Sequence, residues 1–156
     1  MIQRVLFVCT GNTCRSQMAE AFLRKLAPQI EVVSAGIEPE TRIRQETIEV
    51  MREVGIDLEG QYPKDVYDYA DKPFDIVISM CEEGNKILPK LVGDKSKVLQ
   101  IEFDDPASAR GTREQIMSEY REVRDAISKA VEHLYINDFK PKSRRKLAAL
   151  LNIFSV

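Results

Sequence analysis

The stretch VCTGNTCRS (residues 8–16) places two cysteines, a Gly-Asn pair and an arginine between two regular segments. It follows the apolar run VLFV (residues 5–8), which is typical of a buried strand. It leads into QMAEAFLRKL (residues 17–26), whose apolar residues recur at helical spacing. The sequence therefore predicts a strand, a tight loop and a helix in this order. In open α/β sheets ligands bind beyond the carboxyl ends of the strands, so this loop is the first candidate site.

The remaining chain alternates segments of strand and helix character, which predicts βαβ units and a parallel sheet. The run FDIVISM (residues 74–80) is continuously apolar, as expected for a strand covered on both faces. We expect a small three-layer α/β sandwich in which a four-stranded parallel sheet is flanked by helices, with the loop at the carboxyl end of the first strand. The predicted strands cover residues 4–8, 30–36, 74–80 and 97–101, and the predicted helices cover residues 16–26, 43–54, 82 to about 89, and 112–135.

The charge is close to balance over the whole chain but uneven along it. Lys and Arg number 23 against 25 Asp and Glu in 156 residues, so the total gives no reason to expect nucleic-acid binding. Residues 139–156 carry five basic and no acidic residues. We predict one domain over residues 1–136 and a basic, then apolar, helical extension over residues 137–156. This extension could fold onto its own sheet, which we favour, form a dimer contact, or lie on a membrane surface.

Three cysteines, an odd number, argue against a disulfide framework. The N-terminus shows no export signal, and no apolar run approaches the roughly 20 residues needed to span a bilayer. We therefore expect a cytoplasmic protein whose cysteines are either buried and inert or reactive. A structural zinc site needs four ligands, whereas Cys9 and Cys14 have no matching second pair and His133 stands alone. The sequence thus disfavours a zinc site.

Cys9 and Arg15 have the spacing C-x5-R, and five intervening residues are enough to wrap a backbone loop around one tetrahedral anion. The N–H groups of such a loop and the positive end of the following helix attract the anion, and the guanidinium can bind two of its oxygens. The same field stabilises a Cys9 thiolate, which is a nucleophile. Gly11 and Asn12 are the residue types best able to take a positive φ there. The candidate oxyanion-binding residues are Thr10, Gly11, Asn12, Thr13, Cys14, Arg15 and Ser16.

The segment VCTGNTCRSQMAEAF (residues 8–22) resembles the active-site motif of the low-molecular-weight protein tyrosine phosphatase superfamily. More narrowly, it is similar to the thioredoxin-coupled arsenate reductases that share this fold. The resemblance covers roughly residues 3–136. It implies that Cys9 is the nucleophile and that Arg15 clamps the oxyanion together with the amides of the loop.

The resemblance also implies roles for three other residues. Asn12 would hold the shape of the loop, and Ser16 would stabilise the thiolate. The general acid of the superfamily lies in a late Asp-Pro loop, which Asp105 in FDDPA (residues 103–107) matches. Without the motif at the N-terminus, the same Asp-Pro stretch would be interpreted as an ordinary turn.

Three positions separate the two branches, and at each of them the chain resembles the reductases. Gln17 stands where the phosphatases usually have Pro, and Ala107 where they usually carry an aromatic that stacks on the substrate. Cys81 matches the second thiol of the reductases. The predicted function is arsenate reduction, in which arsenate adds to Cys9 and attack of Cys81 on Cys9 releases arsenite. A tyrosine phosphatase that hydrolyses phosphate monoesters through a phosphocysteine is the alternative, and a non-enzymatic oxyanion sensor is the second alternative.

The chain departs from the reductases after Cys81. They usually carry a third thiol about seven residues further on, whereas here CEEGNKILPKL (residues 81–91) has no further cysteine. Either thioredoxin or another external thiol attacks a Cys9–Cys81 disulfide directly, or the activity is mainly phosphatase-like. A protective Cys9–Cys14 disulfide, as members of the phosphatase branch form, is a further alternative.

No tightly bound cofactor is expected, and the expected small-molecule partner is arsenate or a phosphate monoester. Some reductases of this kind bind a monovalent cation near the loop. The matching positions, which carry oxygen ligands suited to such a cation, are Asn12, Glu20, Ser34 and Asp65.

Overall fold

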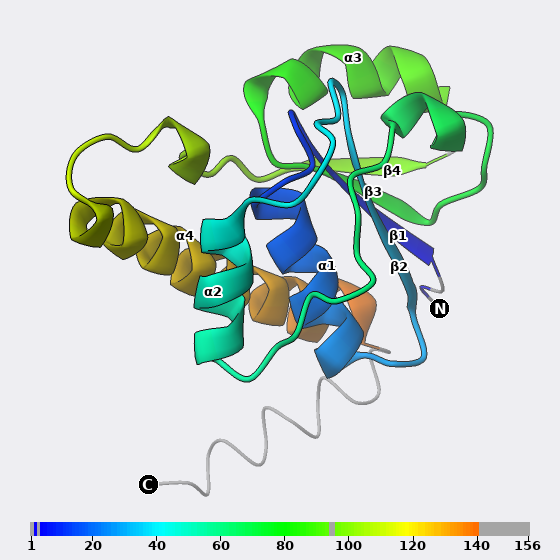
Figure 1. Ribbon diagram of the computed structural model, residues 1–156. Coiled ribbons are helices and arrows are strands. Elements are labelled where there is room, and N and C mark those ends of the chain that lie inside the picture. Colours follow the sequence, from blue (N-terminus) through cyan, green and yellow to red (C-terminus); the bar gives the residue numbers. More distant parts are fainter. Residues whose placement is uncertain (1, 3, 94–95, 141–156) are drawn as a thin grey trace, which may run out of the picture.

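The computed structural model describes residues 2, 4–93 and 96–140 and has the predicted α/β architecture around a four-stranded parallel sheet (Figure 1). The strand order is β2-β1-β3-β4, so β1 lies in the interior of the sheet. The strands are β1 (Arg4–Cys9), β2 (Glu31–Gly36), β3 (Ile76–Ser79) and β4 (Lys97–Gln100). The helices are α1 (Arg15–Leu26), α2 (Gln45–Glu53), α3 (Glu82–Val92) and α4 (Arg113–Leu134). The predicted fold class is confirmed.

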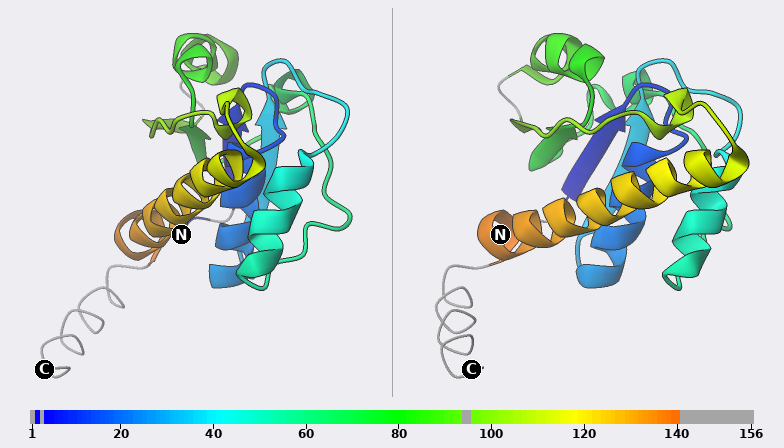
Figure 2. Two further views of the ribbon diagram at one scale, coloured as in Figure 1. Left: turned by 60° about the vertical axis from the view of Figure 1, so that its left-hand side comes forward. Right: turned by 90° about the vertical axis from the view of Figure 1, so that its left-hand side faces the viewer.

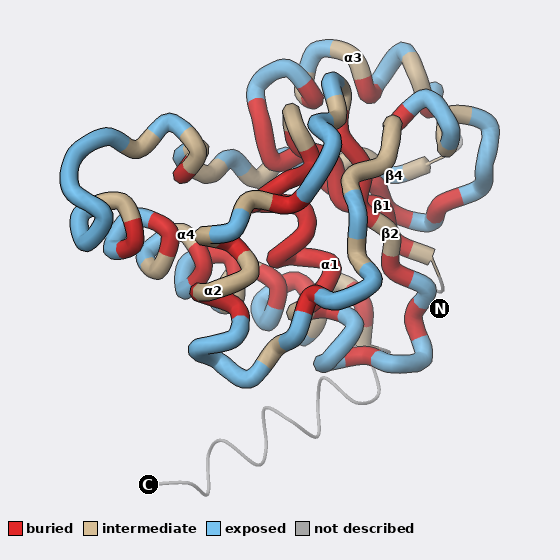
Figure 3. The backbone as a smooth tube through the Cα atoms, viewed as in Figure 1, coloured by how far each residue is buried: buried red, intermediate tan, exposed pale blue. Residues whose placement is uncertain are grey.

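Helices cover both faces of the sheet, which gives three layers. In Figures 1 and 2, α1, α2 and α4 lie on one face and α3 lies on the other. Each face has its own apolar cluster, and β1 contributes to both because successive side chains of a strand point to opposite faces. Val5, Phe7 and Cys9 belong to the cluster under α1 and α4, whereas Leu6 and Val8 belong to the cluster under α3. Figure 3 shows this buried centre of the sheet in red.

Most predicted elements end within two residues of the observed ones, but α3 continues to Val92, past the predicted end at Pro89. Pro89 lies in the last turn, where its missing N–H cannot donate to Asn85. Leu88 and Val92 are both buried in the cluster under α3. Burying a Leu or Val side chain contributes about 1.5–3 kcal/mol each, against a cost of about 3 kcal/mol for an interior proline. The apolar face of the helix therefore overrides the proline.

The carboxyl ends of parallel strands meet at one edge of the sheet, and the segments that follow them meet there as well. The loop of residues 10–14 follows β1, residues 37–44 follow β2, and Cys81 follows β3 before α3 begins. The segment after β4 contains a short 3-10 helix, η3 (Pro106–Ser108), and ends at the capping box that starts α4. The fold thus gathers four connecting segments around one place.

Beyond α4 the chain continues as a π-helical turn, η4 (Tyr135–Phe139), and Phe139 is buried against the cluster under α4. The predicted boundary near residue 136 stays a prediction, and residues 141–156 of the predicted extension lie outside the described residues. Within the described part of the chain, no helix combines the length and apolar character needed to cross a membrane.

Candidate active site

The loop of residues 10–14 is held in place by the segment that follows β2. Three N–H groups of residues 37–40 donate to the carbonyl oxygens of residues 9–11 at 3.0–3.1 Å. The C=O and N–H of a trans peptide point in opposite directions, so the N–H groups of the loop point away from this segment. These N–H groups are therefore available to bind an anion, which is what the C-x5-R spacing predicts.

The loop lines a pocket of about 210 Å³, which is large enough for a tetrahedral anion of four oxygens. The predicted nucleophile, the predicted clamp and the predicted acid all line this one pocket, although they come from distant parts of the chain. The lining residues are Cys9, Thr10, Gly11, Thr13, Cys14, Arg15, Glu38, Glu40, Asp105 and Ala107. The structure therefore brings the predicted residues together, while their chemical roles stay predictions.

Asn12 holds the loop through its side chain and its backbone. Its φ is +55°, which is a left-handed conformation that Asn tolerates better than most residues. Its Nδ2 donates to the hydroxyls of Ser16 at 2.7 Å and Ser34 at 2.9 Å. The expected positive φ is thus found at Asn12 and not at Gly11. At Gly11 a Cβ would lie 3.3 Å from the Glu40 carboxylate, so a larger residue would require the Glu40 side chain to shift.

The Cys9 sulfur lies 2.7 Å from the Ser16 hydroxyl, and both residues are buried. Because Asn12 donates to the Ser16 oxygen, the hydroxyl hydrogen of Ser16 is free to point at the sulfur. Ser16 lies in the first turn of α1, so the positive end of this helix is close to the Cys9 sulfur. The Ser16 contact is the one expected from the predicted role of Ser16 beside the nucleophile.

Arg15 is buried and anchored to two neighbouring segments. One of its guanidinium nitrogens donates to the carbonyl of Phe103 at 3.2 Å and to that of Met80 at 3.4 Å. The other lies 3.4 Å from a carboxylate oxygen of Asp105, whose second oxygen accepts from the N–H of Ala107. The carboxylate thereby lines the pocket, and its side chain is 39% exposed. A group in this position can act as a general acid.

Cys81 caps α3 at the end of β3, beside the loop. Its sulfur accepts from the N–H of Gly84 at 3.3 Å, and the residue is 3% exposed. Burial raises the pKa of the Cys81 thiol, and so does Cys9, whereas the Gly84 N–H, the Thr10 hydroxyl and Arg15 lower that pKa. The pairing of Val8 with Ser79 and the bond from Arg15 to the carbonyl of Met80 place Cys81 at the same edge of the sheet as Cys9.

Three carboxylates near the pocket were missed by sequence reasoning. Glu38 and Glu40 line the pocket, and Glu83 accepts a hydrogen bond from the Thr10 hydroxyl at 3.4 Å. A backbone hydrogen bond at the start of α3 lowers the pKa of Glu83, which keeps it ionised. The signal that could have found them is position, because each follows the carboxyl end of a strand. Glu38, Glu40 and Asp105 thus line the same pocket as Arg15, and Arg15 pairs with Asp105.

Cys14 is buried at the other end of the loop. Its thiol lies 3.7 Å from the Tyr120 hydroxyl and 3.5 Å from the Thr13 hydroxyl. Burial raises the pKa of the Cys14 thiol, and the hydroxyls of Thr47, Thr13 and Tyr120 lower it. The thiol is therefore kept neutral, and the predicted Cys9–Cys14 disulfide stays a prediction, since all three cysteines are free in the structure.

The four residues predicted to bind a monovalent cation lie near one another, but their oxygens already accept hydrogen bonds. Glu20 accepts from the Ser34 N–H at 3.2 Å and from the Gln61 amide at 2.7 Å. Asn12 accepts from the Lys64 N–H at 2.8 Å, and Asp65 accepts from the N–H of Tyr67, capping a short 3-10 helix, η1 (Val66–Tyr69). These oxygens thus have hydrogen-bond partners within the chain, and the cation site stays a prediction.

The arrangement of possible metal ligands can also be compared with that of a zinc site. Across residues 4–93 and 96–140, no three His, Cys, Asp or Glu side chains are grouped as a metal site would require. His133 lies exposed near the end of α4, far along the chain from the cysteines of the loop.

Known proteins resemble this chain in sequence and in fold. A family model described as low molecular weight phosphotyrosine protein phosphatase matches residues 4–146. An arsenate reductase of Halalkalibacterium halodurans is 36% identical over 129 residues, which cover 82% of this chain and 91% of that protein. A glutaredoxin arsenate reductase of Synechocystis sp. is 35% identical over 134 residues, covering 85% and 96%. A solved arsenate reductase in the phosphate-binding state has a TM-score of 0.71 at 36% identity, covering 85% of this chain and 96% of that chain.

Proposed function

The chain belongs to the low molecular weight phosphotyrosine protein phosphatase family, and from this premise we propose that it is an arsenate reductase with Cys9 as its nucleophile. The observation that carries the proposal is the position of Cys81, which directly follows Met80. The N–H of Met80 donates to the carbonyl of Val8 at 2.8 Å, and the carbonyl of Met80 accepts from Arg15 at 3.4 Å, so Cys81 follows a residue that is bound both to the strand before Cys9 and to Arg15. Hydrolysis of a phosphate ester needs one thiolate, whereas reduction of arsenate needs two electrons. A second sulfur next to the nucleophile supplies them.

In the first step the loop amides and Arg15 bind arsenate, and the Cys9 thiolate attacks arsenic. A sulfur–arsenic bond forms and an arsenic–oxygen bond breaks. Asp105 gives its proton to the departing oxygen, which leaves as water. No electron has yet been transferred, and arsenic remains As(V).

In the second step the Cys81 sulfur, as a thiolate, attacks the Cys9 sulfur. The sulfur–sulfur bond forms while the sulfur–arsenic bond breaks, and the electron pair of that bond stays on arsenic. Arsenic becomes As(III) and leaves as arsenite, and the two thiols have been oxidised to a disulfide. The proton of Cys81 passes to solvent.

The Cys9–Cys81 disulfide must be reduced by an external thiol before the next turnover. The residue seven positions after Cys81 is Leu88, which is buried in the apolar cluster under α3 and has no thiol to pass the disulfide on. We propose that a thioredoxin or a glutaredoxin attacks the disulfide directly, and the name of the Synechocystis relative supports the glutaredoxin class. A reducing cytoplasm, in which three cysteines stay free, is part of this proposal.

The proposal is tested by assaying two reactions on two proteins. Wild type and Cys81→Ser are each incubated with arsenate plus a reducing system of thioredoxin or glutaredoxin, and separately with an aryl phosphate. We expect wild type to produce arsenite and Cys81→Ser to produce none above background, with equal aryl phosphate turnover in both. Equal aryl phosphate turnover with no arsenite from wild type would show a phosphatase. Oxyanion binding with no turnover of either substrate would show a sensor.

A phosphatase is the second candidate function, and the position of Asp105 favours it. The carboxyl group lies in the pocket at 3.4 Å from Arg15, where it could protonate the leaving oxygen of an ester as well as that of arsenate. Against it, the pocket is lined by Ala107 and by carboxylates, and neither provides a platform for an aromatic ring. A low rate with aryl phosphates is therefore expected.

The release of arsenite should accelerate with rising pH. The attacking form of Cys81 is the thiolate, and burial raises the pKa of this thiol, so the thiolate fraction at neutral pH is small. Below that pKa the thiolate fraction grows about tenfold per pH unit. Single-turnover arsenite release should follow this rise, whereas aryl phosphate hydrolysis, which does not use Cys81, should lack it. A release rate that is flat between neutral and alkaline pH would contradict Cys81 as the attacking group.

A further inference from the structure

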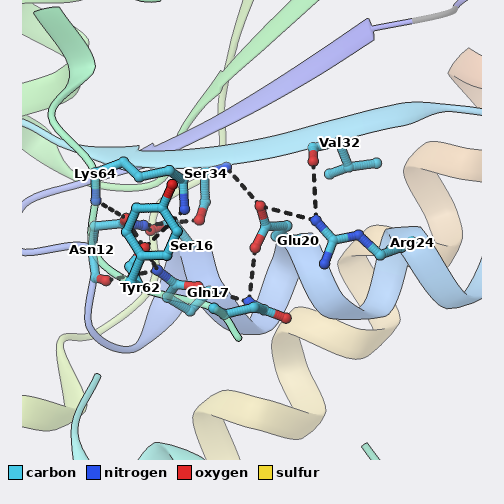
Figure 4. Close-up of polar contacts among 10 residues, drawn as sticks. Asn12, Ser16, Gln17, Glu20, Arg24, Val32, Ser34, Tyr62 and Lys64 are labelled. Carbon is cyan, nitrogen blue, oxygen red and sulfur yellow. Dashed lines mark hydrogen bonds and ion pairs between the residues drawn. The ribbon is translucent and has the colours of Figure 1, made fainter. Parts of the chain in front are cut away.

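A polar cluster behind the loop consists of Asn12, Glu20, Ser34 and Lys64, and it contains one ammonium group (Figure 4). The ammonium of Lys64 donates to the carbonyl of Tyr62 at 2.9 Å and lies 5.0 Å from the centroid of the Tyr62 ring. Figure 4 draws the Lys64 side chain beside those of Asn12, Ser34 and Glu20. A cation belonging to the chain thus stands among the residues expected to bind an ion.

Two cations of the chain offset part of the cost of burying the Glu20 carboxylate. Burial raises the pKa of Glu20, whereas Lys64 and Arg24 lower it, so both cations favour the carboxylate form. Arg24 approaches one carboxylate oxygen at 3.3 Å from the exposed side of α1. Lys64 provides the second positive charge, from the inner side. An added monovalent cation would face two positive charges around one carboxylate.

The same lysine is tied to the loop through its backbone. Its N–H donates to the Asn12 side chain at 2.8 Å, and Asn12 in turn donates to Ser16, which contacts the Cys9 sulfur. A group that fixes residues 62–64 therefore also fixes the left-handed conformation of Asn12.

We propose that the Lys64 ammonium takes the place of a bound monovalent cation in this chain. Its charge stands beside Glu20, and its hydrogen bond to the carbonyl of Tyr62 braces residues 62–64, whose Lys64 N–H binds Asn12. Neither the stability of the fold nor the geometry of the loop therefore requires potassium. The inference stands apart from the reaction that the pocket catalyses, because it concerns the folded state and is measured on it.

The test compares thermal unfolding midpoints in potassium chloride and in choline chloride at equal ionic strength. The proteins are wild type, Lys64→Met, which keeps the apolar stem without the charge, and Lys64→Arg, which keeps the charge. Lys72→Met is the matched control, since Lys72 also lies over a tyrosine ring, that of Tyr69 at 4.8 Å, but outside this cluster. Choline is too large to enter a site that potassium can fill.

We expect wild type, Lys64→Arg and Lys72→Met each to unfold at the same temperature in both salts. Lys64→Met should unfold roughly 2–6 °C below wild type in choline chloride and should regain most of this loss in potassium chloride. A wild type that is stabilised by potassium would overturn the proposal, because the ion would then bind with Lys64 present. The proposal would also be overturned by a Lys64→Met variant whose unfolding midpoint is the same in both salts, or that fails to fold in both. In either case potassium would be unable to replace the ammonium.

Discussion

Replacing Cys9 with Ser is expected to abolish turnover of both arsenate and aryl phosphate, by a factor on the order of 10⁴ to 10⁶, as loss of a catalytic nucleophile does. The physical reason is that a thiol loses its proton far more readily than a serine hydroxyl at the same position. The Ser16 hydroxyl at 2.7 Å and the N-terminus of α1 stabilise a negative charge on sulfur. They do not bring a serine hydroxyl, whose pKa lies far higher, to the alkoxide form. The measurement is the initial rate of arsenite production and of aryl phosphate hydrolysis.

The control for this variant is a measurement of phosphate binding, since the loop N–H groups and Arg15 can bind the anion without the sulfur of Cys9. Cys9→Ser should still bind phosphate in a calorimetric titration, and its unfolding midpoint should stay close to that of wild type because Ser is no larger than Cys. Turnover that survives in Cys9→Ser would mean that another group is the nucleophile. Loss of phosphate binding together with turnover would mean that Cys9 acts on the shape of the loop instead of on the substrate.

Arg15→Lys should have the second largest effect, a loss of about 10²–10³ in kcat/KM for either substrate, comparable to removal of one oxyanion donor. The charge is kept in this variant, so the loss measures geometry. A guanidinium presents two parallel N–H groups to two oxygens of the anion, whereas an ammonium is a point charge. In the structure Arg15 is positioned by the carbonyls of Phe103 and Met80, which orient its plane.

Arg24→Lys is the matched control, because Arg24 lies on the same helix but is half-exposed and pairs with Glu20 instead of lining the pocket. It should retain wild-type kcat/KM. An Arg15→Lys variant with normal kcat/KM would contradict the bidentate clamp. A loss of the same size in Arg24→Lys would show that the effect comes from the stability of α1 and not from the anion.

The second thiol explains why the nucleophile loop cannot decide the reaction by itself. In the proposed mechanism the loop binds a tetrahedral oxyanion, and Cys9 attacks it, whether arsenic or phosphorus stands at its centre. Reduction of the adduct on Cys9 then requires Cys81, which lies just beyond the end of a neighbouring strand. Parallel pairing of β1 with β3 aligns Val8 with Ser79, and this register brings the residues just after both strands to the same edge of the sheet.

Much of the fold followed from local patterns. Continuous apolar runs predicted the buried strands, helical spacing predicted the helices, and their alternation predicted a parallel sheet. The end of α3 was predicted wrongly because Pro89 is a local signal for a helix end, whereas burial of Leu88 and Val92 is a tertiary effect. A local sequence pattern shows that proline lacks a hydrogen-bond donor. It does not show which apolar surface the last turn of the helix will cover.

From the sequence by itself, the C-x5-R segment between a strand and a helix predicted an anion-binding loop with Cys9 as its nucleophile. The second sulfur, Cys81, was predicted from the resemblance to the reductases and not from residue spacing. Only the tertiary structure decided what surrounds them: the carboxylates of Glu38, Glu40 and Glu83 near the pocket, and the Lys64 ammonium among the predicted cation ligands. The reason is physical. Contacts within one turn depend on residue spacing, whereas charges from separate segments meet only after the sheet has fixed its register and its helices have packed.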